Sequence, residues 1–375
     1  MHASIKRIVN PSQAPLGAYS PAVSADGLIY VSGTLARDAS GAVVGTRDVA
    51  AQTRRIIESA GELLSAAGSS LEHVVAVTVY LKSAADFQTM NDAYRPCWRS
   101  DLPTRTTVVT DLILPGALVE MSMVAVPTGA ERLAVHPEGW LRSPSPYSYA
   151  IRSGDLLFLS GVVSRSAKEN TVVAGDLTTQ SRVVLDNAAV LLQADGLSLA
   201  DVVSNRVYIT DASNFDGMNA VYREYFPANP PARATVASGL AGSQYLIEMT
   251  MTAARGSRRV IGAAPPGVPI SQAIRSGRRL YLSGVLGNTP ETKGDVAAQT
   301  REVLERIGKT LREAGALPSD VVDSLVYLRD VSLFAAMDAE YAKFFAGEFP
   351  ARTTIATPLV PPDALVEIMV TAVTE

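Results

Sequence analysis

The sequence predicts an α+β fold in three tandem copies, because three segments repeat and each copy mixes strand and helix patterns. Each copy carries an arginine followed fifteen residues later by a glutamate, within the letters LPTRTT and ALVEM, PPARAT and YLIEM, and FPARTT and ALVEI. Self-similarity of this kind indicates one structural unit used repeatedly. The repeated pairs are Arg105 with Glu120, Arg233 with Glu248, and Arg352 with Glu367.

The distance between equivalent arginines sets the domain boundaries that we expect. These arginines are 128 and then 119 residues apart in a chain of 375 residues, which gives three domains of ordinary size, 1–128, 129–256 and 257–375. Upstream, Tyr19, Tyr147 and Ile270 each lie thirteen residues before a serine. The stretch after that serine is shorter in the third copy, which is typical of a surface loop.

Each element of the first copy follows from its local pattern. Asp26-Gly27 lies between two short apolar stretches, which is a strong signal for a β-hairpin. The next segment has apolar residues at helical spacing from Ile56 to Ala67 and then Gly68, so it predicts an amphipathic helix that ends there. The run HVVAVTVYL is rich in β-branched residues and has the length of a strand.

A second helix and two strands complete the copy. After Ser83, a residue type that favours helix N-termini, Phe87 and Tyr94 lie at helical spacing. Segments 104–110 and 118–126 then predict two closing strands. The order β-β-α-β-α-β-β indicates one sheet with both helices on the same face.

The copies are expected to pack around their uncovered sheet faces. Segments 128–144 and 255–268 are rich in Pro, Gly and Arg, so we interpret them as connectors. A sheet with helices on one face leaves its other face needing cover. Three such sheets could share a pseudo-threefold core, so we expect a monomer that acts as an intramolecular pseudo-trimer.

Composition excludes several classes of protein. The chain is 47% hydrophobic and 19% charged, without an apolar run near the roughly 20 residues of a membrane span. Its first residues lack the apolar stretch of a secretory signal, so a cytoplasmic location is expected. The net charge of −4 argues against a nucleic-acid-binding surface. A single cysteine, Cys97, and three histidines without metal-ligand spacing predict neither a disulfide framework nor a metal site.

The repeated arginine and glutamate suggest chemistry on a small acid. Arginine offers a planar fork that pairs with a carboxylate at two points and stays charged at working pH. A glutamate on the neighbouring strand, between apolar residues such as Val119 and Met121, could have a raised pKa and handle a proton or hold a water. The alternative is a structural ion pair within each module that fixes the register of the last two strands.

Six short segments recur in the same order in all three copies, and in the first copy they read GAYSPAV, YVSGTL, AQT, DFQTMNDAY, LPTRTTV and ALVEM. Together they resemble the RidA/YjgF family of reactive-intermediate deaminases. The resemblance implies the chorismate-mutase-like fold, with sites in the clefts between domains, since family members are homotrimers of one such domain. It also implies hydrolysis of enamines and imines, such as 2-aminoacrylate, to a 2-keto acid and ammonia without metal or organic cofactor.

The resemblance also implies roles for individual residues. The three arginines would bind the substrate carboxylate, and the three glutamates would position the hydrolytic water. The phenylalanine and asparagine would reach in from the neighbouring module. The residues expected to line the pockets are Tyr19, Ser32, Gly33, Phe87, Asn91 and Thr107 in the first copy, Tyr147, Ser160, Gly161, Phe215, Asn219 and Thr235 in the second, and Ser283 and Gly284 in the third.

Three departures from the family pattern affect these expectations. Thr107, Thr235 and Thr354 stand where the family often has cysteine, so we expect no thiol chemistry. The third copy has Ile270 in place of the tyrosine. It also has Asp338 in place of the asparagine, and an aspartate facing an anionic substrate would repel it.

These departures predict that the three clefts are unequal. We hypothesise that each cleft takes its tyrosine, arginine and glutamate from one module and its phenylalanine and asparagine from the next. One cleft then lacks the tyrosine, a second carries the aspartate, and the third is intact. Arg352 should matter least, because its own cleft has lost the tyrosine.

Two other functions stay open. One is a specialised pathway hydrolase of the chorismatase type, since chorismate-cleaving hydrolases also place a site between family-like domains. The other is a regulatory module that binds small carboxylates without turnover. Ribonuclease activity, described for some relatives, is the least favoured interpretation for an acidic chain.

Overall fold

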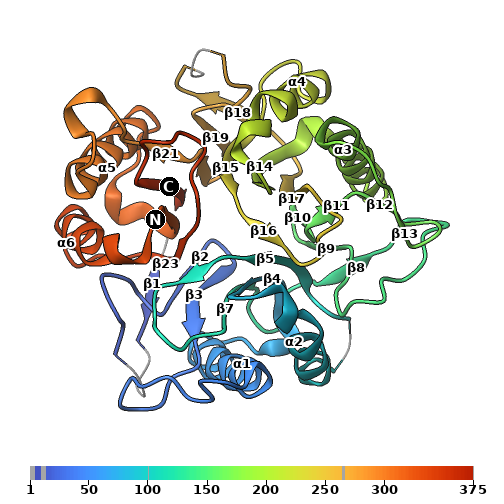
Figure 1. Cartoon of the computed structure of the whole chain (residues 1–375), viewed down its shortest axis with the longest axis horizontal. Coiled ribbons are helices and arrows are strands. Elements are labelled where there is room, and N and C mark those ends of the chain that lie inside the picture. The colour runs from blue at the N-terminus through green and yellow to red at the C-terminus, as the bar shows by residue number, and fades with distance from the viewer. Residues whose placement is uncertain (1–4, 10–13, 100, 264–266, 375) are drawn as a thin grey trace.

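The computed structural model describes every residue except 1–4, 10–13, 100, 264–266 and 375. Three modules follow one another around a central axis, as Figure 1 shows with the first module in blue, the second in green and the third in orange and red. Each module repeats the order β-β-α-β-α-β-β, with additional short strands. The predicted α+β class and its three tandem domains are confirmed.

The first module shows how local sequence produces each element. Asp26 and Gly27 join β2 to β3 with φ values of 48° and 74°, as a two-residue hairpin turn requires. Helix α1 begins after Asp48, whose side chain accepts a hydrogen bond from the Ala51 N–H. The main elements are β1 (Lys6–Ile8), β2 (Ala22–Ala25), β3 (Leu28–Leu35), α1 (Val49–Ala66), β4 (Val74–Leu81), α2 (Phe87–Tyr94), β5 (Thr104–Val109) and β7 (Val119–Ala125).

The other two modules repeat this series. In the second module the main elements are β8 (Leu133–Val135), β9 (Ala150–Ser153), β10 (Leu156–Leu159), α3 (Leu177–Gln193), β14 (Val202–Ile209), α4 (Phe215–Tyr225), β15 (Ala232–Ala237) and β17 (Ile247–Ala254). In the third they are β18 (Arg258–Ile261), β19 (Ala273–Ser276), β20 (Arg279–Leu282), α5 (Val296–Glu313), β22 (Val321–Leu328), α6 (Phe334–Phe345), β23 (Ala351–Ala356) and β24 (Val366–Val373).

The strands of each sheet have the same spatial order. In the first module this order is β1-β2-β3-β7-β4-β5, so the last main strand of the module lies between β3 and β4. Strands β4 and β5 are parallel and are joined through α2, whereas β7 runs antiparallel to both of its neighbours. The strand that carries the glutamate is therefore not beside the strand that carries the arginine.

The two segments expected to be connectors also carry strands. β8 pairs with β9 and β18 pairs with β19, in the same way that β1 pairs with β2. This corrects the interpretation of 128–144 and 255–268 as plain linkers. The pairing satisfies backbone N–H and C=O groups that β9 and β19 would otherwise expose at the sheet edge.

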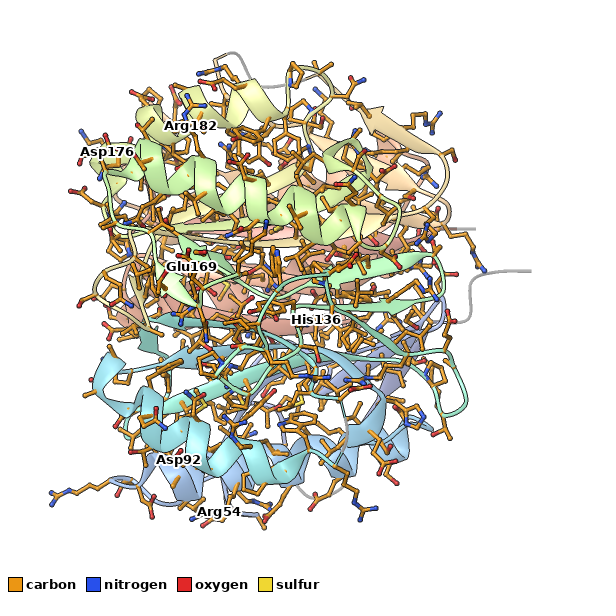
Figure 2. The ribbon with its side chains drawn as sticks, turned by 90° about the vertical axis from the view of Figure 1, so that its right-hand side faces the viewer. Arg54, Asp92, His136, Glu169, Asp176 and Arg182 are labelled. Atoms are coloured by element: carbon orange, nitrogen blue, oxygen red, sulfur yellow. The ribbon has the colours of Figure 1, made fainter. Side chains whose placement is uncertain are left out.

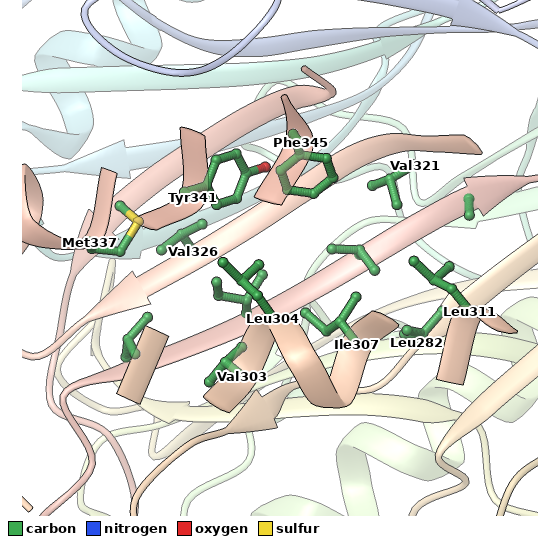
Figure 3. Packing of buried hydrophobic residues seen from close by; sticks show 14 of the residues in the cluster. Leu282, Val303, Leu304, Ile307, Leu311, Val321, Val326, Met337, Tyr341 and Phe345 are labelled. Atoms are coloured by element: carbon green, nitrogen blue, oxygen red, sulfur yellow. The ribbon is translucent and has the colours of Figure 1, made fainter. Parts of the chain in front are cut away.

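The helices cover the outer face of each sheet. Figure 2 shows α3, which carries Arg182, and α2, which carries Asp92, outside the layer of strands. In the third module α5 packs Leu304, Ile307 and Leu311 against α6 and the sheet (Figure 3). Removing this apolar surface from water is the main favourable term in folding. Within the described chain, no helix is both long enough and apolar enough to cross a bilayer.

The inner faces of the three sheets meet around a pseudo-threefold axis. Two clusters of buried residues at this centre draw on all three modules. Equivalent positions of β4, β14 and β22 contribute Tyr80, Tyr208 and Tyr327, which are fully buried there. The sheets thus share a core that no single module could cover by itself.

Short strands cross between modules and close the ring. From the second module, β16 (Gly239–Leu240) pairs with β5 of the first. From the first, β6 (Asp111–Leu112) pairs with β23 of the third. Leu359 of the third module forms a bridge with Val236 of the second. Each module thereby extends the sheet of one neighbour.

Candidate active site

The arginine and glutamate of one module do not meet, which corrects the expectation of a pair on neighbouring strands. In the first module β4 separates β5, which carries Arg105, from β7, which carries Glu120. Their partners on β4 are Val77 and Tyr80, so the two residues are also offset along the sheet. They are separated by two strand spacings across the sheet and by three residues along the strand, which is about 10 Å in each direction. The same strand order in all three sheets excludes the structural ion pair within a module.

The candidate sites form instead at three clefts between modules. We name them the first cleft (modules one and two), the second cleft (two and three) and the third cleft (three and one). In each, the backbone N–H of the arginine donates to a serine hydroxyl of the other module over 2.8 Å. These contacts join Arg105 to Ser160, Arg233 to Ser283, and Arg352 to Ser32.

The division of residues between modules differs from the hypothesis. Phe87 lies on α2, which leads into β5, and its ring faces Arg105 of its own module. Tyr147 and Glu248 come from the second module and line the same cleft. Each cleft therefore takes its arginine, phenylalanine and asparagine or aspartate from one module, and its tyrosine or isoleucine, Ser-Gly pair and glutamate from the next. The hypothesised assignment is wrong because it kept glutamate and arginine together.

The glycine of each Ser-Gly pair makes room for the glutamate. A Cβ atom on Gly161 would overlap the Oε1 atom of Glu248. The Gly161 N–H also donates to the carbonyl oxygen of Arg105 over 3.0 Å, so the backbone passes close to both groups. The equivalent pairs, with the same overlap, are Gly33 with Glu120 and Gly284 with Glu367.

Burial controls the protonation of the three glutamates. Desolvation raises the pKa of Glu120, Glu248 and Glu367 to about 8, and the guanidinium across each cleft opposes that rise. Glu248 also accepts a hydrogen bond from the Thr107 N–H over 3.3 Å. A carboxyl with a pKa close to working pH can both give and take a proton, which suits general acid–base chemistry.

The first cleft keeps the tyrosine, phenylalanine, arginine and glutamate of the expected set around one cavity. The guanidinium of Arg105 lies 5.1 Å from the ring of Tyr94, 5.7 Å from that of Phe87 and 6.0 Å from that of Tyr147. Nη1 of Arg105 and Oδ1 of Asn91 are buried, and neither has a hydrogen-bond partner in the described part of the chain. Arg105 borders a cavity of about 180 Å³. A buried charge without a partner beside a cavity indicates a site for an anionic ligand.

The second cleft is wider and more apolar. Nη2 of Arg233 donates to Oδ1 of Asn219 over 2.7 Å, and burial lowers the pKa of Arg233 to about 10. Ile270 occupies the place of the tyrosine on the wall of a cavity of about 540 Å³. Phe215 and Thr235 line the same cavity. This cleft keeps the arginine and the glutamate but lacks the tyrosine hydroxyl.

In the third cleft the arginine is already neutralised. Nη1 of Arg352 lies 2.7 Å from Oδ1 of Asp338, and this oxygen also accepts a hydrogen bond from the Ala18 N–H over 3.0 Å. The ring of Tyr19 lies 5.5 Å from the same guanidinium, so this cleft keeps its tyrosine. We expected Arg352 to matter least because its cleft had lost the tyrosine, and this reason is therefore wrong. The reason that the geometry offers is the ion pair with Asp338.

Two kinds of residue in the clefts were missed from the sequence. Tyr94, Tyr222 and Tyr341 lie 5.1, 4.5 and 4.7 Å from the guanidinium groups of the three arginines. Each lies eleven residues before its arginine, and this constant spacing could have identified them. Arg165 and Tyr245 also line the first cleft. Neither position is retained in all three copies, so the repeat gave no signal for them.

Comparisons with known proteins agree with this architecture. The family model described as endoribonuclease L-PSP matches three times, over residues 10–127, 140–255 and 261–374. A RutC family protein from Sulfurisphaera tokodaii is 40% identical over 111 residues, which cover 30% of this chain and 89% of the relative. The 3-aminoacrylate deaminase RutC of Acinetobacter baylyi is 38% identical over 122 residues, which cover 32% of this chain and 97% of the relative.

A solved structure described as a chorismatase matches on a larger scale. It is similar over 80% of this chain and 93% of its own, with a TM-score of 0.52 and 18% sequence identity. At this identity the match shows a shared fold. It supports the expected chorismate-mutase-like architecture of the three domains.

Proposed function

Because the chain belongs to the endoribonuclease L-PSP family and resembles RidA/YjgF proteins, we propose that it hydrolyses small imine or enamine carboxylic acids to 2-keto acids and ammonia. The first cleft is the proposed active site. The observation that carries the proposal is the buried, unpartnered Nη1 of Arg105 beside a cavity that Glu248 also lines. The relative from Acinetobacter baylyi, a 3-aminoacrylate deaminase, supports the same reaction class.

Substrate binding uses the two unpartnered polar groups of the cleft. Arg105 binds the substrate carboxylate through its free N–H groups, a charge-assisted contact that contributes about 1.5–3 kcal/mol. Oδ1 of Asn91 accepts a hydrogen bond from the substrate nitrogen. The rings of Phe87 and Tyr147 enclose the substrate and exclude bulk water, which strengthens both polar contacts.

Glu248 handles the protons of the reaction. A water adds to the imine carbon, so that a C–O bond forms while the π electrons of the C=N bond move to nitrogen. Glu248, which is mostly protonated, donates its proton to the imine nitrogen and takes one from that water, which gives a neutral carbinolamine. In the second step it donates again, to the amino nitrogen, and takes the proton of the carbinolamine hydroxyl. The carbinolamine then collapses, the C–N bond breaks, and a keto group and ammonia result. An enamine first becomes an imine by proton transfer to carbon, so the overall reaction consumes one water and no oxidant or reductant.

The three clefts differ in their proposed activity. The second cleft, with Arg233 and Glu367 but without the tyrosine, is a weaker site. The third is inactive because the ion pair with Asp338 prevents Arg352 from binding a substrate carboxylate. We place the working unit as a monomer in the cytoplasm, where a single unpaired cysteine, Cys97, is in keeping with a reducing compartment.

The test compares equivalent arginines. An amino-acid oxidase generates the imine of alanine in situ, and release of pyruvate and ammonia is followed. Arg105→Met should lower kcat/KM by about tenfold or more, because the carboxylate loses its anchor. The control is the double variant Arg352→Met with Asp338→Leu, which removes the whole ion pair of the third cleft and leaves no unpaired charge. It should keep activity within about threefold.

Each negative outcome has a separate meaning. If the wild-type chain does not accelerate keto-acid release over buffer, the deaminase proposal fails. If both arginine variants lose activity equally, the assignment to the first cleft fails. Binding of pyruvate without turnover by the wild type, unchanged in Glu248→Gln, would instead support a regulatory carboxylate-binding module. Stabilisation of the fold by chorismate and not by 2-keto acids would support the chorismatase type.

A further inference from the structure

A second arginine lies on the wall of the first cleft, and none of the steps above uses it. Arg165 belongs to the second module, in β12 (Arg165–Ser166), which pairs with β13 (Thr171–Val172) as a small hairpin. Its side chain lines the same cavity as Arg105 of the first module. Two cationic side chains from different modules therefore face one small space.

Neutral groups hold Arg165 in place. Its Nε donates to Oδ1 of Asn170 over 2.7 Å, and its Nη1 donates to the hydroxyl of Tyr245 over 3.1 Å. Its Nη2 contacts the carbonyl oxygen of Asn170, which turns the hairpin with a φ of 60°. The ion pairs found in the described part of the chain do not include Arg165, so its positive charge is fixed but not neutralised.

The charge balance of the cavity favours a dianion. Two guanidinium groups face one carboxyl, Glu248, whose pKa of about 8 keeps it mostly protonated at neutral pH. Burial raises the pKa of Tyr147, and a hydrogen bond with Ser143 and then the charges of Arg105 and Arg165 oppose that rise. Arg105 and Arg165 therefore both influence the hydroxyl group of Tyr147. A cleft with one sign of charge and low-dielectric walls concentrates ligands of the opposite sign.

The other two clefts differ from the first at the position of Arg165. In the second cleft the position equivalent to Arg165 is Asn288, which donates to Oδ1 of Asp363 over 2.9 Å. In the third it is Arg37, but Arg352 there already pairs with Asp338. The cavity of the second cleft is also bordered by Arg306 and Lys309, but Arg306 pairs with Glu302 over 2.7 Å. Within the described residues, the first cleft combines a substrate-binding arginine without a counter-ion and a second arginine on the cavity wall that makes no ion pair.

We propose that the first cleft selects imines or enamines of acidic amino acids, with Arg105 binding the carboxylate next to the reacting carbon and Arg165 binding the distal carboxylate. The inference rests on the proposed function, because it names the substrate class of that same site. The reaction is the hydrolysis described above, and the distal carboxylate takes no part in the bond changes. A cavity of about 180 Å³ suits a small acid of this kind.

The kinetic test uses two imines and two variants. Amino-acid oxidases generate the imines of alanine and of glutamate in situ, and kcat/KM is measured for each. The wild type should prefer the glutamate imine by tenfold or more, and Arg165→Gln should lower that preference by about tenfold, the value of one charge-assisted contact. The control is Arg182→Gln on α3, a surface arginine paired with Glu224, which should leave the preference unchanged.

A binding measurement separates this inference from the proposed function. Calorimetry compares 2-oxoglutarate, a dianion, with pyruvate, and Arg165→Gln should weaken the dianion about tenfold more than the monoanion. If the wild type hydrolyses the alanine imine but shows no preference for dianions in either assay, this inference is overturned and the proposed function stands. If neither imine is hydrolysed, the proposed function fails. The calorimetric comparison then decides whether Arg165 still selects dianions.

Discussion

At the scale of single residues, one position distinguishes the clefts most clearly. Asn91, Asn219 and Asp338 occupy equivalent positions, and Asn219 and Asp338 each contact the arginine of their own module. The amide of Asn219 leaves the charge of Arg233 in place, whereas the carboxylate of Asp338 cancels that of Arg352. The exchange of an amide nitrogen for a carboxylate oxygen therefore separates an arginine that keeps its charge from one that is neutralised.

An exchange at this position tests the argument. Asn91→Asp should lower kcat/KM for the alanine imine by about tenfold or more, because the new carboxylate pairs with Arg105 and competes with the substrate. The reverse change, Asp338→Asn, should add one pyruvate-binding site per chain in calorimetry, because Arg352 loses its counter-ion. Unchanged activity in the first variant, together with unchanged stoichiometry in the second, would contradict this account of the third cleft.

The buried glutamates predict a pH dependence of stability. The pKa of Glu120 is about 8 in the folded chain, well above its ordinary value near 4.5. Between these two values the folded state keeps a proton that the unfolded state has lost, so stability is fully present below pH 4.5 and falls as pH rises to about 8. The effect is on the order of a few kcal/mol for each such carboxyl.

Glu120→Gln isolates this effect in the third cleft, which we propose to be inactive. The variant keeps the shape of the side chain but does not titrate, so its free energy of unfolding should fall less between pH 5 and pH 8.5 than that of the wild type. Urea unfolding at both pH values gives the comparison. Glu58→Gln, an exposed position on α1, is the control and should follow the wild type. Parallel pH profiles for Glu120→Gln and the wild type would show that Glu120 does not titrate in this range.

At the scale of elements, a buried glutamine ties the first helix of each module to the strand that carries the glutamate. In the second module, Oε1 of Gln180 accepts from the Leu246 N–H over 2.8 Å, and its Nε2 donates to the carbonyl oxygen of Gln244 over 3.0 Å. Gln52 and Gln299 make equivalent contacts. Helix α3 therefore holds the start of β17, one residue before Glu248.

Removing this link should affect stability and the first cleft together. Gln180→Leu leaves a buried N–H and a buried carbonyl unpaired, which should cost about 2–5 kcal/mol in the free energy of unfolding. It should also lower kcat for imine hydrolysis, because Glu248 loses its support. The control is Gln52→Leu, which disturbs the third cleft and should lower stability by a similar amount without lowering kcat. Equal losses of kcat in both variants would refute the positional argument.

The sequence predicted the elements well because their signals are local. Hairpin, helix and strand patterns such as Asp26-Gly27 and the apolar face of α1 depend on a few neighbouring residues. The pairing of strands does not. Arg105 and Glu120 lie on consecutive main strands, and only the long-range insertion of β7 between β3 and β4 puts them in different clefts. The residue types of the site could therefore be predicted from spacing, but not their division between modules.

At the scale of the whole molecule, fusion of the three copies has made the centre asymmetric. Thr78, Arg206 and Leu325 occupy equivalent positions of β4, β14 and β22, and Nη1 of Arg206 donates to Oγ1 of Thr78 over 3.2 Å. A cavity of about 110 Å³ at the centre is lined by all three. In a trimer of identical second modules, three copies of Arg206 would approach the axis and repel one another. The present arrangement thus requires three different modules around one axis.

This asymmetry predicts that the chain works as a monomer. The inner sheet faces are covered within the chain, and β16 and β6 already occupy the edges of β5 and β23. Sedimentation equilibrium should therefore give a mass near 39.6 kDa that does not change with concentration. Exchange of modules between chains would preserve the same local contacts, but it would make the mass rise with concentration. A stable assembly of three chains at low concentration would contradict the intramolecular ring, because the ring already covers the inner sheet faces within one chain.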